Sequence, residues 1–278
     1  MNAPRYLEAC QPLVEAALDA ALPPEGEPPA RLHAAMRHLV FPGGKRLRPA
    51  LALAAAEAVG GKREAALPAA VAVELVHVYS LIHDDLPCMD DDVERRGRPT
   101  VHVAFDEATA VLAGDALLTR AFGVLVEDAG DDDFARRLDA VRTLSDAAGA
   151  AGLVGGQVDD LAGDAKDTAS VESVHARKSA ALIAASITCG ARLAGADGTR
   201  LATLHEAGLA AGIAFQIADD LLDAEDEEDC SLVPVLGADG ARARATELLA
   251  NALDPLDRMG EPAEPLRGLL RYAVEREI

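Results

Sequence analysis

The sequence has no tryptophan, and aromatic residues make up only 3% of its 278 positions. It also has few β-branched runs, and no segment alternates apolar and polar residues over the length of a strand. Alanine and leucine dominate instead, and both are strong helix formers. Half of the residues are apolar, so the chain can bury a large core. The composition therefore predicts an all-α protein with one domain over residues 1–278.

Positive charge is scarce as well. The chain has 26 lysine and arginine residues against 47 acidic ones, which gives a formal net charge of −21. This charge argues against nucleic acid and anionic membranes as partners, because both are themselves negative. Only four residues are lysines, and two of them, Lys45 and Lys178, stand beside expected helix starts.

The four cysteines are far apart and form no CxxC pair, which indicates reduced thiols in the cytoplasm. The N-terminal segment carries acidic residues through its apolar part and so does not resemble a signal peptide. The most apolar stretch, residues 180–196, is rich in alanine and interrupted by Arg192. We interpret it as a buried helix and predict no membrane span.

Apolar periodicity, broken by glycines and prolines, predicts nine helices. They cover residues 5–21, 30–39, 49–59, 66–86, 107–128, 134–149, 171–194, 199–223 and 240–254. The helix over 66–86 is apolar nearly all round, so we expect it at the centre of the protein. Its C-terminal end would then carry polar side chains into the interior.

Those polar side chains begin the first acidic cluster, LIHDDLPCMDDDVERRG, over residues 81–97. We expect Asp84, Asp85 and Asp90 to converge near the helix end, where Pro87 bends the chain. His77 lies about two helical turns before Asp84 and therefore shares its face. A solvated run of charges is the structural alternative to a functional site here.

The second acidic cluster, FQIADDLLDAEDEED over residues 215–229, makes that alternative weaker. Two such helix ends facing each other would gather six carboxylates, which cannot share a cavity unless cations neutralise them. Oxygen ligands of this kind suit Mg²⁺, and neither cluster has the pattern of an EF-hand loop. The predicted magnesium ligands are Asp84, Asp85, Asp90, Asp219, Asp220 and Asp223.

Basic residues indicate what the metal ions hold. The segment GGKRLRP, residues 43–49, places Lys45 and Arg48 in a glycine-opened loop before a helix, where backbone N–H groups attract anions. Arg95 and Arg96 offer forked donors suited to phosphate. Lys178 stands at the head of another apolar helix. These features predict a substrate with a diphosphate head and a hydrocarbon tail.

The ordered motifs resemble those of the trans-isoprenyl diphosphate synthases, or polyprenyl synthetases, which include farnesyl and geranylgeranyl diphosphate synthases. The matching segments from residue 43 to 223 are GGKRLRP, LVHVYSLIHDDLPCMDDDVERRGRPTVH, GLVGGQVDDLAGD, HARKSAAL and AFQIADDLLD. The resemblance implies a single helical bundle around a deep central cavity, usually a homodimer. It also implies a Mg²⁺-dependent enzyme, with three ions per site, that joins isopentenyl diphosphate to an allylic diphosphate.

The same resemblance assigns roles to individual residues. Lys45, Arg48, His77 and Arg96 match the isopentenyl diphosphate site, and Arg95 matches an allylic diphosphate ligand. Lys178, Ser179 and Gln216 match positions along the allylic substrate, although the family usually has threonine where Ser179 stands. The residues expected to carry catalysis are Asp84, Asp85, Asp90, Lys178, Asp219 and Asp220.

Product length is expected to depend on the side chains below the first acidic cluster. Tyr79, five residues before Asp84, is bulky, and Ser80 is small. In related enzymes a large group there tends to stop growth near fifteen carbons, which favours farnesyl diphosphate. The DLPCMD insertion also occurs in twenty-carbon synthases, so geranylgeranyl diphosphate is the alternative product.

The sequence departs from the family pattern after the second acidic cluster. Family members usually have a longer, lysine-bearing loop, whereas residues 223–245 are acidic and no lysine follows Lys178. Either Arg242 or Arg244 replaces those lysines in an active enzyme, or the chain is a non-catalytic synthase-like subunit that binds or regulates. We favour the enzyme because the upstream ligand groups are all present.

Two other enzyme classes share single features. His83 and Asp84 resemble the His-Asp pair of helical metal-dependent phosphohydrolases, but that chemistry needs further metal-binding histidines and leaves the second cluster unexplained. A class I terpene cyclase shares the first aspartate motif but ordinarily has a different second metal motif in place of DDLLD.

Overall fold

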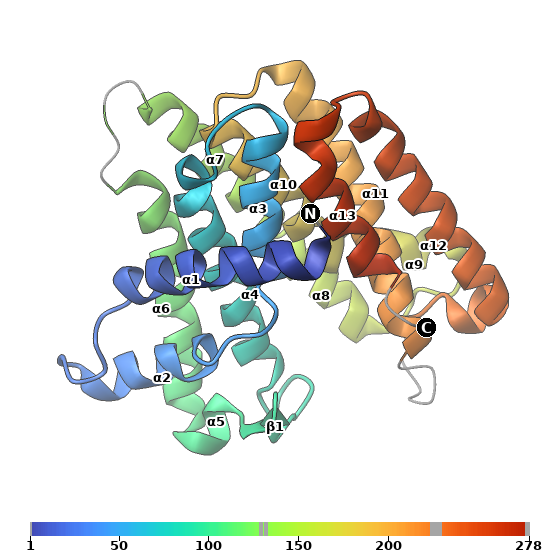
Figure 1. Ribbon diagram of the computed structural model, residues 1–278. Helices are drawn as coiled ribbons and strands as arrows, with labels where there is room; N and C mark the ends of the chain where they lie inside the picture. The colour runs from blue at the N-terminus through green and yellow to red at the C-terminus, as the bar shows by residue number, and fades with distance from the viewer. Residues whose placement is uncertain (1, 128–129, 131–132, 223–229, 276–278) are drawn as a thin grey trace.

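The computed structural model describes residues 2–127, 130, 133–222 and 230–275, and α-helices dominate this part of the chain (Figure 1). The all-α prediction is therefore confirmed. In chain order the α-helices are α1 (Ala3–Ala21), α2 (Ala30–Val40), α3 (Leu47–Ala58), α4 (Leu67–Asp84), α5 (Val101–Ala104), α6 (Glu107–Val126), α7 (Phe134–Ala148), α8 (Leu153–Ala162), α9 (Thr168–His175), α10 (Ala181–Leu193), α11 (Gly198–Leu222), α12 (Val233–Asp257) and α13 (Glu264–Val274). Short 3₁₀ segments, Arg63–Ala66 and Glu261–Ala263, precede α4 and α13.

Side-chain caps explain where several helices begin. Asn2 accepts a hydrogen bond from the Arg5 backbone N–H at α1, and Asp106 accepts one from Thr109 at α6. At α9, Asp167 and Ser170 form a reciprocal capping box. Each cap satisfies a backbone donor that the first helical turn leaves without a partner.

Helix α4 is central, as the sequence predicts. It packs against α3, α6 and α10, and nearly all of its side chains before His83 are buried. Helix α1 lies across the front of this group in Figure 1 and contacts α3, α4 and α13. The buried apolar side chains form one core. The C-terminal end of α4 consequently brings its aspartates to the middle of the molecule.

Several helices differ from the sequence prediction. The short helix α5 was not expected, and α12 begins at Val233 where the prediction begins at residue 240. The helix expected over 171–194 is α9 and α10 joined by one π-helical turn, Ala176–Ala180. Helices α8 and α13 were not predicted, since α8 contains two glycines and α13 is short and follows two prolines. Both are amphipathic and gain their stability from packing against the bundle.

A small β-hairpin corrects the expectation that the chain has no strand. Strands β1 (Glu94–Arg95) and β2 (Arg98–Pro99) pair antiparallel across a two-residue turn. The turn residues Arg96 and Gly97 have φ values of 56° and 72°, the conformation that matches the twist of a tight hairpin. The hairpin places Arg96 at its tip.

Three described segments are long and apolar enough to cross a membrane by length and composition alone. They are Arg63–Asp84, Glu107–Val126 and Gly198–Leu222. The first is the segment that ends in central helix α4, and 72% of its most apolar window is buried inside the protein. The absence of a membrane span stays a prediction.

Glycines on α11 set its distance from the π-helical turn. A Cβ atom at Gly212 would lie 2.5 Å from both Cα and Cβ of Ala180. We expect Gly212→Ala to lower the free energy of unfolding by about 1–3 kcal/mol, because one helix must move away from the other. Urea unfolding followed by circular dichroism measures the change.

Gly268→Ala is the matched control for that experiment. Gly268 lies inside α13, and a Cβ atom there would meet no described atom within 4 Å. This variant should raise the free energy of unfolding by about 0.5–1 kcal/mol through helix propensity. Equal effects of the two substitutions would contradict close packing at Gly212.

Candidate active site

Three adjoining cavities lie where α3, α4, the hairpin, the π-helical turn and α11 meet. The basic cavity, about 250 Å³, is lined by Lys45, Arg46, Arg48, Glu74, His77, Arg96, Phe215 and Tyr272, among others. The central cavity, about 550 Å³, shares Arg48, His77, Arg96 and Phe215 with it and adds Arg95, Ser179, Gln216 and Asp219. The acidic cavity, about 350 Å³, shares Ser179 and Gln216 with the central one and adds Asp90, Asp160, His175, Lys178 and Cys230. The central cavity therefore adjoins both the basic and the acidic one and shares wall residues with each.

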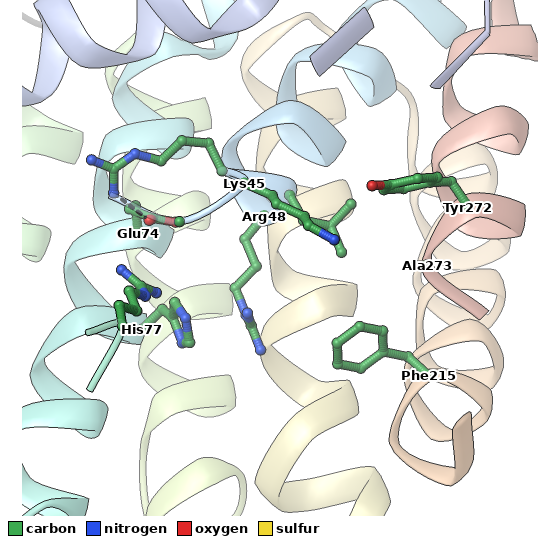
Figure 2. A pocket seen from close by; sticks show the side chains of 11 residues that line it. Lys45, Arg48, Glu74, His77, Phe215, Tyr272 and Ala273 are labelled. Atoms are coloured by element: carbon green, nitrogen blue, oxygen red, sulfur yellow. Dashed lines mark hydrogen bonds and ion pairs between the residues drawn. The ribbon is translucent and has the colours of Figure 1, made fainter. Parts of the chain in front are cut away.

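The basic cavity gathers its cations from three elements. Lys45 precedes α3, while Arg48 lies in the first turn of α3 and not in the loop that the sequence predicts. Figure 2 shows both side chains extending toward the space between His77 and the aromatic rings of Phe215 and Tyr272. The Lys45 Nζ atom lies 5.6 Å from the centre of the Tyr272 ring, a cation–π contact.

His77 stands among these cations and is uncharged at neutral pH. Burial lowers its pKa well below the ordinary value, and Arg48, Arg96 and Arg95 lower it further. Burial also lowers the pKa of Arg48, an effect that the charges of Glu74 and Asp219 oppose. The cavity therefore holds a neutral imidazole among strong cations, which suits a polyanionic group.

The first acidic cluster folds back on itself after α4. The backbone N–H of Asp90 donates to the Asp84 carbonyl at 2.9 Å, so the two aspartates come together as predicted. The pKa of Asp84 is raised to about 7. Burial is the largest cause, Asp90 and Asp85 add to it, and Lys178 opposes it. Burial also raises the pKa of Asp90. Two such carboxylates form a site that favours a cation.

Asp85, a predicted magnesium ligand, contacts a side chain of the hairpin. Its side chain is buried, and its Oδ1 atom accepts from Arg95 Nε at 2.5 Å. Arg95 also donates to Asp92 at 2.7 Å. The second Asp85 oxygen has no hydrogen-bond partner among the described residues. Asp85 thus orients Arg95 at the wall of the central cavity.

Lys178 lies on the π-helical turn, a distortion that often occurs at functional sites. Its Nζ atom donates to Asp160 of α8 at 2.5 Å, and it also acts electrostatically on Asp84 and Asp90. Although burial lowers the pKa of Lys178, the hydrogen bond and charge of Asp160 raise it above the ordinary value. The lysine therefore stays charged inside the acidic cavity.

Asp160 is a site residue that the sequence analysis did not single out. Gly156 lies one turn before it, and a Cβ atom there would fall 2.3 Å from the Lys178 backbone nitrogen. Only a glycine lets α8 approach the π-helical turn so closely. The i, i+4 spacing of the glycine and the aspartate within GGQVDD was the available signal.

A chain of side chains connects the acidic cavity to the second cluster. Ser179 Oγ donates to Gln216 Oε1 at 2.5 Å, and Gln216 Nε2 donates to Asp220 Oδ1 at 3.0 Å. Asp220 is buried, and its Oδ2 atom lies 3.5 Å from His175 Nε2. Burial raises the pKa of Asp220, and His175 opposes that effect. Asp220 thereby orients Gln216.

The other two predicted ligands of the second cluster have different outcomes. Asp219 lines the central cavity together with Arg48, and its charge opposes the lowering of the Arg48 pKa by burial. Asp223 lies outside the described residues. Its role stays a prediction.

The donor set fits Mg²⁺. Asp90 lines the acidic cavity and Asp219 the adjoining central one, while Asp84 lines none of the three cavities but acts electrostatically on Asp90 and Lys178; all three aspartates supply only carboxylate oxygens. Within the described ranges, no three His, Cys, Asp or Glu side chains converge enough to hold a metal ion alone. This suits Mg²⁺, which binds through one or two carboxylates together with water and phosphate oxygens.

The two residues expected to set product length lie on α4. Tyr79 is buried, its ring lies edge-on to His83 at 5.8 Å, and burial with the charge of Asp84 raises its pKa to about 12. Ser80 Oγ donates to the His77 carbonyl at 2.9 Å. Neither residue lines the three cavities, so their role stays a prediction.

The arginines considered as substitutes for the missing lysines bind other acids. Arg244 donates to both carboxylate oxygens of Glu172, at 2.6 and 3.0 Å, and to Glu247 at 2.8 Å. Arg242 donates to Asp239 at 3.3 Å. Neither lines the three cavities.

Comparison with known proteins identifies the family of this chain. Residues 29–262 match the polyprenyl synthetase family model. The chain is 46% identical over 204 residues to a farnesyl diphosphate synthase of Bacillus subtilis, covering 72% of this chain and 69% of that protein. It is 38% identical to a heterodimeric geranylgeranyl pyrophosphate synthase large subunit of Arabidopsis thaliana, covering 98% of this chain and 79% of that one.

Solved structures give the same answer. An FPP/GFPP synthase from Zymomonas mobilis superposes with a TM-score of 0.89 at 40% identity, covering 96% of this chain and 97% of that one. This chain belongs to the polyprenyl synthetase family.

The pKa of Asp84 generates a prediction. The folded value, about 7, exceeds the ordinary 3.8, so the folded protein binds the proton more tightly than the unfolded chain. The stability that this group contributes is present at low pH and is lost as the pH rises through 7. In metal-free buffer near pH 8, Asp84→Asn should unfold with a free energy about 1–3 kcal/mol higher than wild type.

Chemical denaturation across the pH range checks this expectation, with the exposed Asp115→Asn as the control. The difference between Asp84→Asn and wild type should shrink as the pH falls toward about 5. A difference that stays constant with pH would show that Asp84 is not a buried, proton-binding carboxyl.

Proposed function

We propose that this chain, a short-chain prenyl diphosphate synthase by its family and relatives, makes farnesyl diphosphate. In this proposal isopentenyl diphosphate binds in the basic cavity, and the allylic diphosphate binds between the two acidic clusters. The observation that carries it is that the three cavities adjoin and share the wall residues Arg48 and His77 on one side and Ser179 and Gln216 on the other. One diphosphate would be bound by basic side chains and the other between carboxylates, and the two substrates would lie next to each other.

The residues of the basic cavity would hold their diphosphate without metal. Lys45, Arg48 and Arg96 supply charged donors, and neutral His77 supplies one more polar contact without adding charge. These groups fix the double bond of isopentenyl diphosphate toward the central cavity. Holding both reactants in place removes much of the entropy cost of joining them.

The acidic cavity would hold the allylic diphosphate. Mg²⁺ bound by Asp84, Asp90 and Asp219 would stabilise negative charge on the departing diphosphate, as metal ions do in such sites. Lys178 and Arg95 add fixed positive charge beside those oxygens. Since Lys178 stays protonated, it contributes without any proton transfer.

The allylic cation that departure leaves needs electron-rich neighbours that are poor nucleophiles. Ser179 donates its proton to Gln216, so the Ser179 oxygen keeps lone pairs for the cation. The π-helical turn places this oxygen beside the central cavity. The proton lost after coupling goes to the released diphosphate, as the family implies, and no side-chain base is needed.

We propose a homodimer in which a second copy covers α6. Val111, Leu112 and Val126 on this helix are 41%, 58% and 41% exposed, which is unusual for large apolar side chains on so apolar a helix. We also propose that the protein works in the cytoplasm. All four cysteines are free, which suits a reducing compartment.

The proposed function is tested by incubating the purified protein with Mg²⁺, labelled isopentenyl diphosphate and dimethylallyl, geranyl or farnesyl diphosphate in turn. We expect dimethylallyl and geranyl diphosphate to give a fifteen-carbon product and farnesyl diphosphate to give little. A twenty-carbon main product would contradict the length. Arg242 and Arg244 bind Asp239 and Glu172, so neither replaces the missing lysines in this structure. If no primer gave a product, the alternative of a non-catalytic subunit would be favoured.

Tyr79→Ala, assayed in the same way, tests the source of the length limit. Removing a buried ring opens space on α4 one turn before His83, so we expect longer products at an unchanged rate of primer use. Val78→Ala, at the neighbouring buried position, is the control and should leave product length unchanged. An unchanged product from Tyr79→Ala would place the floor elsewhere.

A further inference from the structure

Lys45, in the loop before α3, and Arg48, in the first turn of α3, flank a third basic residue, Arg46. Arg46 is the residue before α3 and adopts a left-handed conformation with φ 53°, which is rare outside glycine. From this position its side chain reaches Glu74 of α4. The side chain of Arg46 is only 2% exposed.

The guanidinium group of Arg46 is occupied by protein acceptors. It donates to both Glu15 oxygens, at 2.8 and 3.2 Å, to Glu74 Oε1 at 2.6 Å and to the Val40 carbonyl at 2.6 Å. These acceptors belong to α1, α4 and the end of α2. Four of the five N–H groups of an arginine are thereby used, so Arg46 joins three helices and has little left for a ligand.

The two glycines of the loop make room for guanidinium groups. A Cβ atom at Gly43 would lie 2.0 Å from the Arg46 Cζ atom, and one at Gly44 would lie 3.1 Å from an Arg96 nitrogen. The glycines therefore serve the packing of arginines as well as the shape of the loop.

Glu74 links Arg46 to the ligand-binding cations. It is almost fully buried, lines the basic cavity, and precedes His77 by one turn of α4. Burial lowers the pKa of both Arg48 and Arg96, and the charge of Glu74 opposes this effect, which stabilises their charged forms before any anion arrives. If the Arg46–Glu74 pair moved, the backbone before α3 would move with it. The stabilisation of the charged forms of Arg48 and Arg96 by Glu74 would then weaken.

We propose that Arg46, held by Glu15 and Glu74, is a positioning residue that sets the affinity of the basic cavity for isopentenyl diphosphate. It does so by fixing the backbone from which Lys45 and Arg48 extend. This inference rests on the proposed function, since it assigns the basic cavity to that substrate. It predicts an effect on one substrate only.

The test compares Arg46→Gln with Arg267→Gln. Arg267 is a comparable buried arginine, since it contacts Glu264 at 2.7 Å, Asp257 at 3.4 Å and the Leu256 carbonyl at 2.8 Å, but it lies on α13, against the C-terminal end of α12, and lines none of the three cavities. We expect Arg46→Gln to raise KM for isopentenyl diphosphate about tenfold or more, with kcat and KM for geranyl diphosphate within about twofold of wild type. Arg267→Gln should leave both KM values unchanged.

Calorimetric titration with isopentenyl diphosphate and with inorganic diphosphate, without Mg²⁺, gives a second readout. Arg46→Gln should bind both at least about tenfold more weakly than wild type and Arg267→Gln. If wild type shows no turnover, the proposed function fails, whereas this binding comparison still decides the role of Arg46. If Arg46→Gln does not fold, Glu15→Gln replaces it and should give a smaller loss in the same direction.

Equal KM changes for both substrates, or equal effects of Arg46→Gln and Arg267→Gln, would overturn the proposal. The proposal would also be overturned if Arg46→Gln or Glu15→Gln bound both diphosphates as tightly as wild type does. Arg46→Lys separates charge from geometry. Lysine keeps the charge but cannot make the forked contacts, so it should remain as weak as Arg46→Gln.

Discussion

Charge buried inside an apolar helical bundle is the constraint on which this structure depends. Moving an isolated ion out of water costs several kcal/mol of free energy, so each buried charge needs a partner. Arg46 meets two glutamates, Asp85 meets Arg95, and Lys178 meets Asp160. These pairs join neighbouring helices, and they leave two groups of like charge facing a shared space. A substrate with its metal ions would complete the balance.

The two groups differ in kind. The basic cavity has more cations than acids and can accept a diphosphate directly. The acidic cavity has more carboxylates than cations, and burial raises the pKa of Asp84 and Asp90, so an anion needs divalent cations to enter. Ser179 and Gln216 lie between them as neutral oxygen-bearing groups. In the proposed function, the basic cavity would retain its diphosphate and the acidic cavity would release the other one.

Local patterns in the sequence predicted most of the helices and several residues of the cavities. The apolar run before Asp84 indicated a central helix, and the paired aspartate clusters indicated the site, because both signals depend on residues a few positions apart. Details that depend on distant contacts were not predicted. The π-helical turn at Lys178 depends on the close approach of α8 and α11 at Gly156 and Gly212.

The same limit applies to individual partners. Asp160 reaches Lys178 from 18 residues away, and Glu15 and Glu74 reach Arg46 from 31 and 28 residues away. No spacing rule within one helix specifies such pairs. The hairpin is different, because the Arg96-Gly97 pair between short polar runs could have indicated a tight turn. Residues 223–229 belong to the part of the chain that the structure does not describe.

In the proposed function, one cavity binds a diphosphate directly through basic side chains, and the other binds a diphosphate through Mg²⁺. The most direct measurement is calorimetric titration of the wild-type protein with isopentenyl diphosphate and, separately, geranyl diphosphate, each with Mg²⁺ and with a chelator. The account predicts that isopentenyl diphosphate binds under both conditions, whereas geranyl diphosphate binds only with Mg²⁺. Binding of both compounds only with Mg²⁺, or of geranyl diphosphate with the chelator, would contradict the division into a basic and an acidic cavity.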